Sequence, residues 1–343
     1  MQQGAIFVAA ATGMAAISIR RRSAQLNCKK TIYCFPDLKS LGNVEAKLSE
    51  AGRRIGEKPF KTLALTQDIA ENDTTRFDVL GAFQKSLKTS KLGRTGLYCS
   101  TLPSTQTLLR ETFNSERTGM VCIVDRQSKG LGRGGNTWES PHGCCMFSLK
   151  CQEISGQRLP FVQYMISLAV VRAIKGLPGG AGIDVAIKWP NDIYVNKELK
   201  VGGVLCQSTY QQNVFDLTIG VGINTTNDEP TVSLNSVRTP GSPPITREEL
   251  LAGILNHFES MMNVFYTDGF SVFAKAYTES WMHSNQKVQV VLKDGTDPIA
   301  VTIKGIAEAS GGLYAIDDHG NPYELYPDGN SFDFFKGLIR RKL

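Results

Sequence analysis

Three short motifs that could handle phosphate follow one another between residues 188 and 224. They read Lys-Trp-Pro-Asn-Asp at 188–192, Lys-Val-Gly-Gly-Val-Leu at 200–205 and Gly-Val-Gly-Ile-Asn at 220–224. Trp189-Pro190 predicts an abrupt strand end, because proline lacks an N–H and biases the residue before it away from helix. We therefore expect the polar pair Asn191 and Asp192 to be held at the end of a strand.

A glycine-rich basic loop at residues 127–138 precedes these motifs. Its four glycines leave backbone N–H groups open to an anion, and Arg133 adds a planar cationic group suited to phosphate or carboxylate. The loop also satisfies Gly-x-Gly-x-x-Gly, but a dinucleotide-binding turn requires a helix that starts at the loop. Because Trp138, Pro141 and a predicted strand follow instead, we expect an anion-binding loop, with a purely structural glycine hairpin as the alternative.

Taken in order, these four motifs resemble those of the biotin protein ligases, also called holocarboxylase synthetases. The resemblance covers about residues 100–343, and the segment 326–336 is similar to the plant members in particular. It implies an α+β fold: a mixed or antiparallel sheet with packed helices, as in class II synthetases, followed by a small SH3-like β-barrel. It also implies formation of biotinyl-5′-AMP from biotin and ATP, with Mg²⁺, and transfer of biotin to a lysine of apo carrier domains, such as that of acetyl-CoA carboxylase.

The resemblance assigns roles to particular residues. The expected catalytic residues are Arg133, Lys200 and Asp192, and Lys200 would contact the biotin carboxylate and the activated phosphate. Asp192 would orient Lys200, accept a proton or bind Mg²⁺, and the sequence leaves these roles open. The expected biotin-binding residues are Ser104, Thr105, Gln106, Gln127, Gly130, Arg133, Lys200 and Gly203. The expected ATP-binding residues are Trp138, which would stack on adenine, Lys188, Asn191 and Asn224.

Each of these residues also has an ordinary structural interpretation. Taken alone, Lys200 would be a surface lysine and Trp138 a core side chain, while Asp192 and Asn224 would be turn residues. The chain also departs from the family pattern at two positions. Leu131 stands where many bacterial members carry arginine, which puts an anion-binding role for this position in doubt. Gln106 replaces the usual asparagine and keeps the amide at a longer reach.

Two other functions remain open from the sequence. A lipoate ligase or octanoyltransferase resembles biotin ligases in fold and also modifies a carrier lysine. A regulator that binds biotin or nucleotide without catalysis would follow if Leu131 marks lost activity. Some relatives are repressors, but residues 1–90 lack the paired amphipathic helices with a glycine turn that a DNA-binding helix-turn-helix requires, so no nucleic-acid partner is expected.

Composition is ordinary for a soluble globular protein. The 343 residues carry a formal charge of +6, which favours anionic substrates weakly and gives no reason to expect nucleic acid. The eight cysteines form no Cys-x-x-Cys pair, so we expect reduced, mostly buried thiols and no zinc site. We expect a monomer or weak dimer without a membrane partner.

The first 36 residues contain no Asp or Glu, and an apolar run at 5–19 precedes Arg20-Arg-Arg22. This pattern favours an organelle transit peptide, for chloroplast or mitochondrion, over a membrane anchor or secretory signal. A disordered leader on a cytosolic protein is the alternative. We expect an extension of unassigned role at 37–90, the catalytic domain at 91–285 and the β-barrel at 286–343.

Periodicity predicts the elements that position the motifs. We expect helices at 104–113, 161–175 and 247–266, the first capped by Ser104 and the last by a Thr246/Glu249 capping box. Strands are expected at 120–125, 144–151, 183–187, 200–209 and 214–223, and short ones at 288–292, 300–306, 313–316 and 322–325. The connections at 196–197 and 211–213 are too short for crossover helices, so antiparallel pairing is favoured.

Overall fold

The structure is a computed structural model. It describes residues 31–35, 46–48, 50, 61–64, 76–113, 118–153, 155–227, 229–291, 297–326, 330–333 and 338–341. The predicted transit peptide lies outside the described residues except for Thr31–Phe35. That short segment is a strand, so the boundary predicted at residue 36 falls immediately after a strand of the main sheet.

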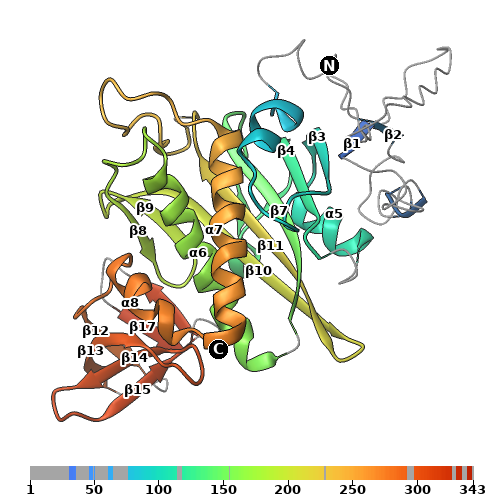
Figure 1. The fold of residues 1–343 in the computed structure, drawn as a ribbon. Coiled ribbons are helices and arrows are strands. Elements are labelled where there is room, and N and C mark those ends of the chain that lie inside the picture. Colours follow the sequence, from blue (N-terminus) through green and yellow to red (C-terminus); the bar gives the residue numbers. More distant parts are fainter. Residues whose placement is uncertain are drawn as a thin grey trace.

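A nine-stranded sheet forms the centre of the molecule (Figure 1), with the order β2-β1-β3-β4-β7-β11-β10-β9-β8. The strands are β1 Thr31–Phe35, β2 Lys61–Ala64, β3 Gly96–Leu102, β4 Val121–Gln127, β7 Cys144–Glu153, β8 Val185–Lys188, β9 Asp192–Val195, β10 Leu199–Gln211 and β11 Val214–Asn224. Among the described pairings of this sheet only β1–β2 and β3–β4 are parallel, so the expected mixed sheet with mainly antiparallel pairing is confirmed.

The tight connections within this sheet lie where the sequence predicts them. Asn196 and Lys197 join β9 to β10, and Gln212 and Asn213 join β10 to β11, all four with positive φ. Paired left-handed residues match the right-handed twist of hairpin strands. These turns bring the three predicted motifs side by side on neighbouring strands.

Helices cover both faces of the sheet. They are α5 Thr105–Thr112, α6 Leu159–Gly176, α7 Arg247–Asp268 and α8 Ser271–Glu279, with the short elements η1 Val79–Phe83, α4 Gln84–Ser86 and η4 Gly156–Arg158. Helices α6 and α7 lie against each other over one face (Figure 1), while α5 lies over β4, β7 and β11. The predicted caps are confirmed: Ser104 Oγ accepts from Thr107 N, and Thr246 Oγ1 accepts from Glu249 N at 3.2 Å.

The C-terminal strands form a separate six-stranded sheet, β12 Lys287–Val291, β13 Ile299–Ile306, β14 Leu313–Asp317, β15 Pro322–Leu325, β16 Asn330–Asp333 and β17 Leu338–Arg341. All four predicted strands are present, and β16 and β17 are additional. The order is β15-β14-β13-β12-β17-β16. In the described part of this sheet β15 and β16 are the two edges, and the sheet is compatible with the predicted small SH3-like domain.

A hydrogen bond to a buried ion pair ties the region before residue 91 to the main core. Arg247 Nη1 on α7 contacts Asp125 Oδ1 on β4 at 2.9 Å, and the same carboxylate accepts from Phe77 N and from the Tyr98 hydroxyl. Burial raises the pKa of Asp125 despite these partners. Phe77 and Phe83 are buried in the same core, so the described part of the extension is a packed component of the domain. Its separate role stays unassigned.

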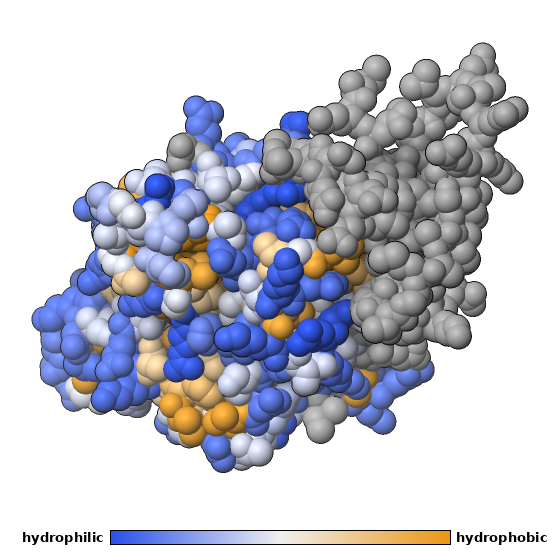
Figure 2. Space-filling view, turned by 45° about the horizontal axis from the view of Figure 1, so that its top comes forward, coloured by the Kyte–Doolittle hydropathy of each residue, from blue (hydrophilic) through white to orange (hydrophobic). Residues whose placement is uncertain are grey.

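The seven described cysteines without a disulfide are buried or half-buried, and burial raises the pKa of Cys144 to about 12. Figure 2 shows a mostly hydrophilic surface with small, separate hydrophobic areas. No helix in the described ranges is both long and apolar enough to cross a membrane. Within the same ranges, no three His, Cys, Asp or Glu side chains are grouped as a metal site would require.

Candidate functional site

A cavity of about 620 Å³ lies between the glycine-rich loop, the start of α5, the turn from β8 to β9 and the strands β10 and β11. The predicted site residues that line it are Ser104, Thr105, Gln106, Gln127, Arg133, Trp138, Lys188, Asn191, Asp192, Lys200 and Gly203. Gly130 and Asn224 do not line it. Residues separated by about a hundred positions in the chain therefore share one site, because strand pairing places their elements next to one another.

One end of the cavity, which we call the polar end, is a hydrogen-bond network of uncharged side chains: Thr105, Gln106, Gln127 and Ser148. Thr105 N donates to Gln127 Oε1 at 2.8 Å, and Thr105 Oγ1 lies 2.8 Å from Ser148 Oγ. Ser148 Oγ donates to Gln106 Oε1 at 3.1 Å, and Gln106 Nε2 donates to Thr218 O at 2.8 Å. Thr105, Gln106 and Ser148 are buried, so the surrounding core holds the network rigidly in place.

The direction of this network follows from counting hydrogens. Each hydroxyl supplies a single proton, so Thr105 and Ser148 cannot both donate to glutamines while also bonding each other. If Thr105 donates to Ser148 and Ser148 donates to Gln106, both hydroxyl protons are used and Thr105 N still serves Gln127. The polar end then offers acceptor oxygens rather than free hydroxyl donors.

The opposite end, which we call the charged end, carries Arg133, Lys188, Asp192 and Lys200. Lys200 Nζ contacts Asp192 Oδ1 at 2.8 Å and lies 5.5 Å from the centre of the Trp138 ring. Lys188 Nζ lies 3.5 Å from Tyr194 Oη. Three cations against one carboxylate leave an excess of two positive charges among the charged residues that line the cavity. Such an imbalance suits an anionic ligand.

The segment that carries Asn191 is fixed to the neighbouring strand at two points. Asn191 Nδ2 donates to Val204 O at 3.0 Å, and Val204 N donates to Asn191 O at 2.8 Å. Strand β8 ends at Lys188 and β9 begins at Asp192, so the predicted abrupt end at Trp189-Pro190 is confirmed. Asp192 therefore reaches Lys200 from a braced turn.

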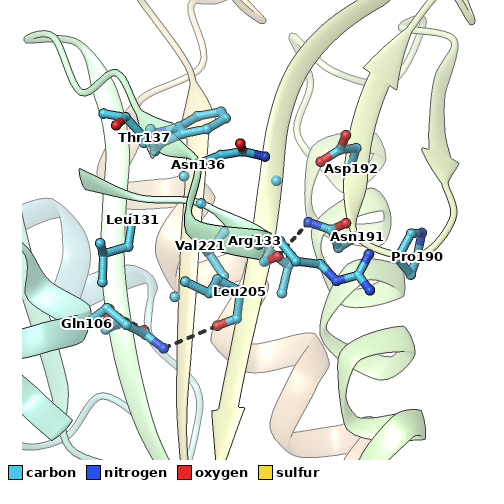
Figure 3. Close-up of a pocket in the computed structure, with 18 of the residues that line it drawn as sticks. Gln106, Leu131, Arg133, Asn136, Thr137, Pro190, Asn191, Asp192, Leu205 and Val221 are labelled. Atoms are coloured by element: carbon cyan, nitrogen blue, oxygen red, sulfur yellow. Dashed lines mark hydrogen bonds between the residues drawn. The ribbon is translucent and has the colours of Figure 1, made fainter. Parts of the chain in front are cut away.

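The glycine-rich loop is a small hairpin folded over the cavity. Strands β5 Gly130–Leu131 and β6 Thr137–Trp138 pair, with Gly130 opposite Trp138, and a turn of 3₁₀ helix at Arg133–Gly135 joins them. A Cβ on Gly130 would lie 2.3 Å from Trp138 O, so this glycine is required by the hairpin. Leu131 faces the side of Gln106, whereas Arg133 points toward Pro190 and Asn191 (Figure 3).

Two glycines on β11 leave room for two side chains that are predicted to contact the ligand. A Cβ on Gly220 would lie 2.7 Å from Gln106 Oε1, and a Cβ on Gly222 would lie 2.7 Å from Trp138 Nε1. Both are shorter than real Cβ contacts allow. The motif at 220–224 therefore admits the side chains of Gln106 and Trp138 against bare backbone, one at each end of the cavity.

Asn224 lies just outside the cavity and is buried. Its Nδ2 donates to Thr231 Oγ1 at 3.0 Å and to Val232 O at 3.3 Å, and Thr231 Oγ1 donates to Lys200 O at 2.9 Å. This residue is therefore connected to the Lys200 backbone through one intermediate side chain. Its predicted nucleotide contact stays a prediction.

Sequence reasoning did not single out several lining residues. Ser148 lies inside an apolar strand, where one serine gives no signal of function. Leu325 and Tyr326 reach the cavity from the end of β15, in the C-terminal sheet. Only the resemblance of the segment 326–336 to plant ligases pointed to that region, and it gave no reason to place it at the site.

Asp192 is the only carboxylate among the described residues that line the cavity, so the cavity offers Mg²⁺ a single carboxylate ligand. Magnesium in nucleotide sites commonly takes one or two carboxylates and completes its shell with phosphates and water. Asp192 fits that pattern as a single protein ligand supplemented by the nucleotide.

The fold and the site place the chain in the class that joins a cofactor acid to a protein. The model of the biotin/lipoate A/B protein ligase family matches residues 97–224, which hold the cavity floor, the loop and the three motifs. A solved structure of the biotin protein ligase from Aquifex aeolicus in complex with biotin and ATP aligns with a TM-score of 0.57 and 25% identity, over 72% of this chain and 99% of that one.

Curated relatives narrow the class. Biotin–protein ligase 1, chloroplastic, of Arabidopsis thaliana is 42% identical over 81% of this chain and 77% of its own length. Biotin–protein ligase 2 of the same plant is 41% identical over 81% of this chain and 86% of its length. The chain belongs to the biotin–protein ligase family, and the family expected from the sequence is confirmed.

Proposed function

We propose that this ligase acts in two steps at the cavity, forming biotinyl-5′-AMP from biotin and ATP and then transferring biotin to a lysine of an acceptor protein. The observation that carries the proposal is the division of the cavity into an uncharged polar end and a charged end. Biotin has the same division: a neutral ureido ring at one end and a carboxylate at the other. The ring N–H groups suit the acceptor oxygens of Gln106 and Gln127.

The first step must bring a carboxylate and a triphosphate together. Two unit charges 4 Å apart at an effective dielectric near 20 interact by about 4 kcal/mol, here repulsively. Lys200 and Arg133 would offset this repulsion and stabilise the charge that develops as the carboxylate attacks the α-phosphate and pyrophosphate leaves. The backbone N–H groups of the loop would add to this, and Trp138 would stack on the adenine.

Asp192 would have two compatible roles in this step. Its contact with Lys200 Nζ at 2.8 Å fixes the position of the ammonium, so the cation is aimed before the substrates arrive. Its other carboxylate oxygen would hold Mg²⁺, which would screen the phosphate charges and polarise the reacting phosphorus–oxygen bonds. Lys188 and Asn191 would contact the phosphates or ribose from the same turn.

The second step forms an amide bond between the acceptor lysine and biotin and releases AMP. The amine must be neutral, and deprotonating a lysine of ordinary pKa about 10.4 at pH 7 costs roughly 4.6 kcal/mol. The cations Lys200 and Arg133 would lower this cost by disfavouring a second ammonium nearby. Asp192 is within reach of the same space and is a candidate proton acceptor.

The acceptors we propose are apo biotin carboxyl carrier domains of biotin-dependent carboxylases, such as that of acetyl-CoA carboxylase. The tail at 326–336 and the Arabidopsis relative named chloroplastic support a plant-type ligase that works in a plastid. Under this proposal residues 1–30, which precede strand β1, act as a transit peptide, with import into isolated chloroplasts as the test. A cytosolic location of a fluorescent fusion would contradict it.

The direct test is to incubate the protein with Mg²⁺-ATP and radiolabelled biotin, with and without an apo carrier domain. We expect biotinyl-AMP without the carrier, and label on the carrier only when its acceptor lysine is present. Incorporation of lipoate or octanoate in place of biotin would assign the sister activity instead. Binding of biotin with neither adenylate nor labelled carrier would leave a regulator.

A further inference from the structure

The turn Trp189–Asn191 at the charged end is held by groups from two other parts of the chain. Trp189 N donates to His283 Nε2 at 2.9 Å, and Trp189 Nε1 donates to Tyr164 Oη at 2.9 Å. Gln163 Nε2 donates to Pro190 O at 2.9 Å. Gln163 and Tyr164 belong to α6, whereas His283 lies in the segment 280–286 that leads from α8 into the C-terminal sheet.

This segment runs along the free edge of β8 before it reaches the turn. Ile187 N donates to Ser280 O at 2.7 Å, and Met282 N donates to Ile187 O at 3.0 Å. Trp281 forms an isolated parallel bridge with Ile187. Ile187, two residues before the turn, is therefore paired to the segment that carries His283, and the histidine follows directly after this pairing.

His283 is fully buried and can serve the turn only as an acceptor. Its Nδ1 lies 2.9 Å from Gln286 Oε1, so the proton on Nδ1 is donated to that oxygen and Nε2 is left with the lone pair that Trp189 N requires. Burial lowers the pKa of His283 to about 4, so the ring is neutral at pH 7. The Nε2 acceptor is thus present under ordinary conditions.

The C-terminal sheet holds the other side of the same connection. Ile303 N on β13 donates to Gln286 O at 2.9 Å, and Asn285 N donates to Ile303 O at 3.1 Å. Tyr164 Oη, which accepts from the Trp189 indole, donates to Gly311 O at 2.6 Å. Each N–H group of Trp189 is therefore connected through side chains to β13 or to the connection between β13 and β14.

We propose that His283 is a positioning residue for the adenylation step: through Trp189 it links the C-terminal sheet to the turn that places Asn191 and Asp192 at the charged end. The polar end is built on α5, β4 and β7 and has no such link among the described contacts. Loss of the His283 acceptor should therefore impair the use of ATP and leave recognition of the biotin ring at the polar end intact. The inference rests on the two-step function proposed above.

Two substitutions separate the acceptor from the rest of the ring. His283→Gln places an amide oxygen near the position of Nε2 and keeps an acceptor for Trp189 N, whereas His283→Asn reaches only the position of Nδ1. We expect His283→Asn to lower kcat/KM for ATP at least tenfold, since a misplacement of about 1 Å can cost roughly a hundredfold. We expect His283→Gln to restore most of that loss.

The measurements are pyrophosphate release as a function of ATP, and the Kd of biotinamide, which lacks the carboxylate, by calorimetry without ATP. The proposal expects the biotinamide Kd of His283→Asn to stay within about twofold of wild type, a change too small to reflect a lost contact. His257→Asn is the matched control, because it shortens a half-buried histidine on α7 that does not touch the turn. It should behave as wild type in both assays.

Tyr164→Phe is the second variant, because it removes the hydroxyl between Trp189 and Gly311 and keeps the ring. It should also reduce the use of ATP selectively, which keeps the test decisive if His283→Asn does not fold. Wild-type adenylation by His283→Asn, or losses of biotinamide and ATP affinity in equal proportion, would overturn the proposal. Absence of adenylation by the wild-type chain would instead refute the underlying function.

Discussion

The two ends of the cavity are suited to recognise a ligand by different interactions. At the polar end, the amide and hydroxyl groups of Thr105, Gln106 and Ser148 are buried and already bonded to one another or to backbone. At the charged end, Lys200 is about one third exposed and rests on a single carboxylate. A rigid network selects a shape and a hydrogen-bond pattern, whereas an excess of charge attracts any anion of suitable size. We expect specificity to come from the first end and rate from the second.

The largest effect should follow from removing charge. Lys200→Met keeps most of the side-chain volume, and we expect adenylate formation to fall by about 10² to 10³, as when one stabilising donor is lost from other active sites. Single-turnover release of pyrophosphate measures it. Lys175→Met, at an exposed position on α6 outside the cavity, is the control. A Lys200→Met enzyme with normal turnover would remove the charged end from the chemistry.

The buried His283, which supports the charged end, should make the stability of the protein depend on pH. The folded pKa of His283 is about 4 and its ordinary value is 6.5, so the unfolded chain binds more protons between these values. The free energy of unfolding should therefore decrease as the pH is lowered from 6.5 to 4. This residue accounts for roughly 3 kcal/mol of the decrease, at 1.36 kcal/mol per pKa unit. Urea unfolding of wild type and His283→Gln at pH 7 and pH 4 measures the difference. If the free energy of unfolding decreased equally for the two proteins between pH 7 and pH 4, the result would argue against a buried neutral ring.

Two glycine substitutions should separate the ends by substrate. Gly220→Ala would press on Gln106 and Gly222→Ala on Trp138, each from 2.7 Å. Overpacking of this kind commonly costs about 1–3 kcal/mol, or roughly tenfold in affinity. We expect the first to raise KM for biotin and the second to raise KM for ATP, and each serves as the control for the other. Identical profiles would mean that the cavity behaves as one unit.

The smallest effect should come from salt. Charges that are partly exposed are screened over a Debye length of about 10 Å at 0.1 M, so raising the salt concentration weakens the attraction for ATP. We expect KM for ATP to rise by roughly threefold between 50 and 300 mM KCl, since exposed charges are screened more than buried ones. The Kd of biotinamide, which carries no charge, should change little. A stronger dependence for biotinamide would contradict the division of the cavity.

Local sequence patterns predicted the elements with long or regular signals. Helices α6 and α7 and strands β7, β10 and β11 have clear apolar periods, and their turns carry Asn or Gln where positive φ is needed. Strand β9 was missed because its four residues between Pro190 and Asn196 are too few to show a period. Helix α8 was missed because it begins only three residues after α7 ends, beyond Gly269.

The residues of the site also fall into those that the sequence predicted and those that it could not predict. The motif residues Arg133, Asp192 and Lys200 were predicted to share a site and do line one cavity. Tyr326 and His283 could not be placed there, because their positions depend on how the C-terminal sheet packs against α6 and β8. A single sequence carries no local pattern for such packing, so the support of a site is harder to predict than its motifs.

The ion pair between Lys200 and Asp192 has a consequence for self-labelling. An enzyme that produces an amine-reactive adenylate must protect its own lysines, and Lys188 and Lys200 line the cavity in which that adenylate would form. The Lys200 ammonium donates to Asp192 at 2.8 Å, and an ammonium has no lone pair with which to attack a carbonyl. The same contact that aims the cation therefore keeps the Lys200 side chain from becoming the first acceptor.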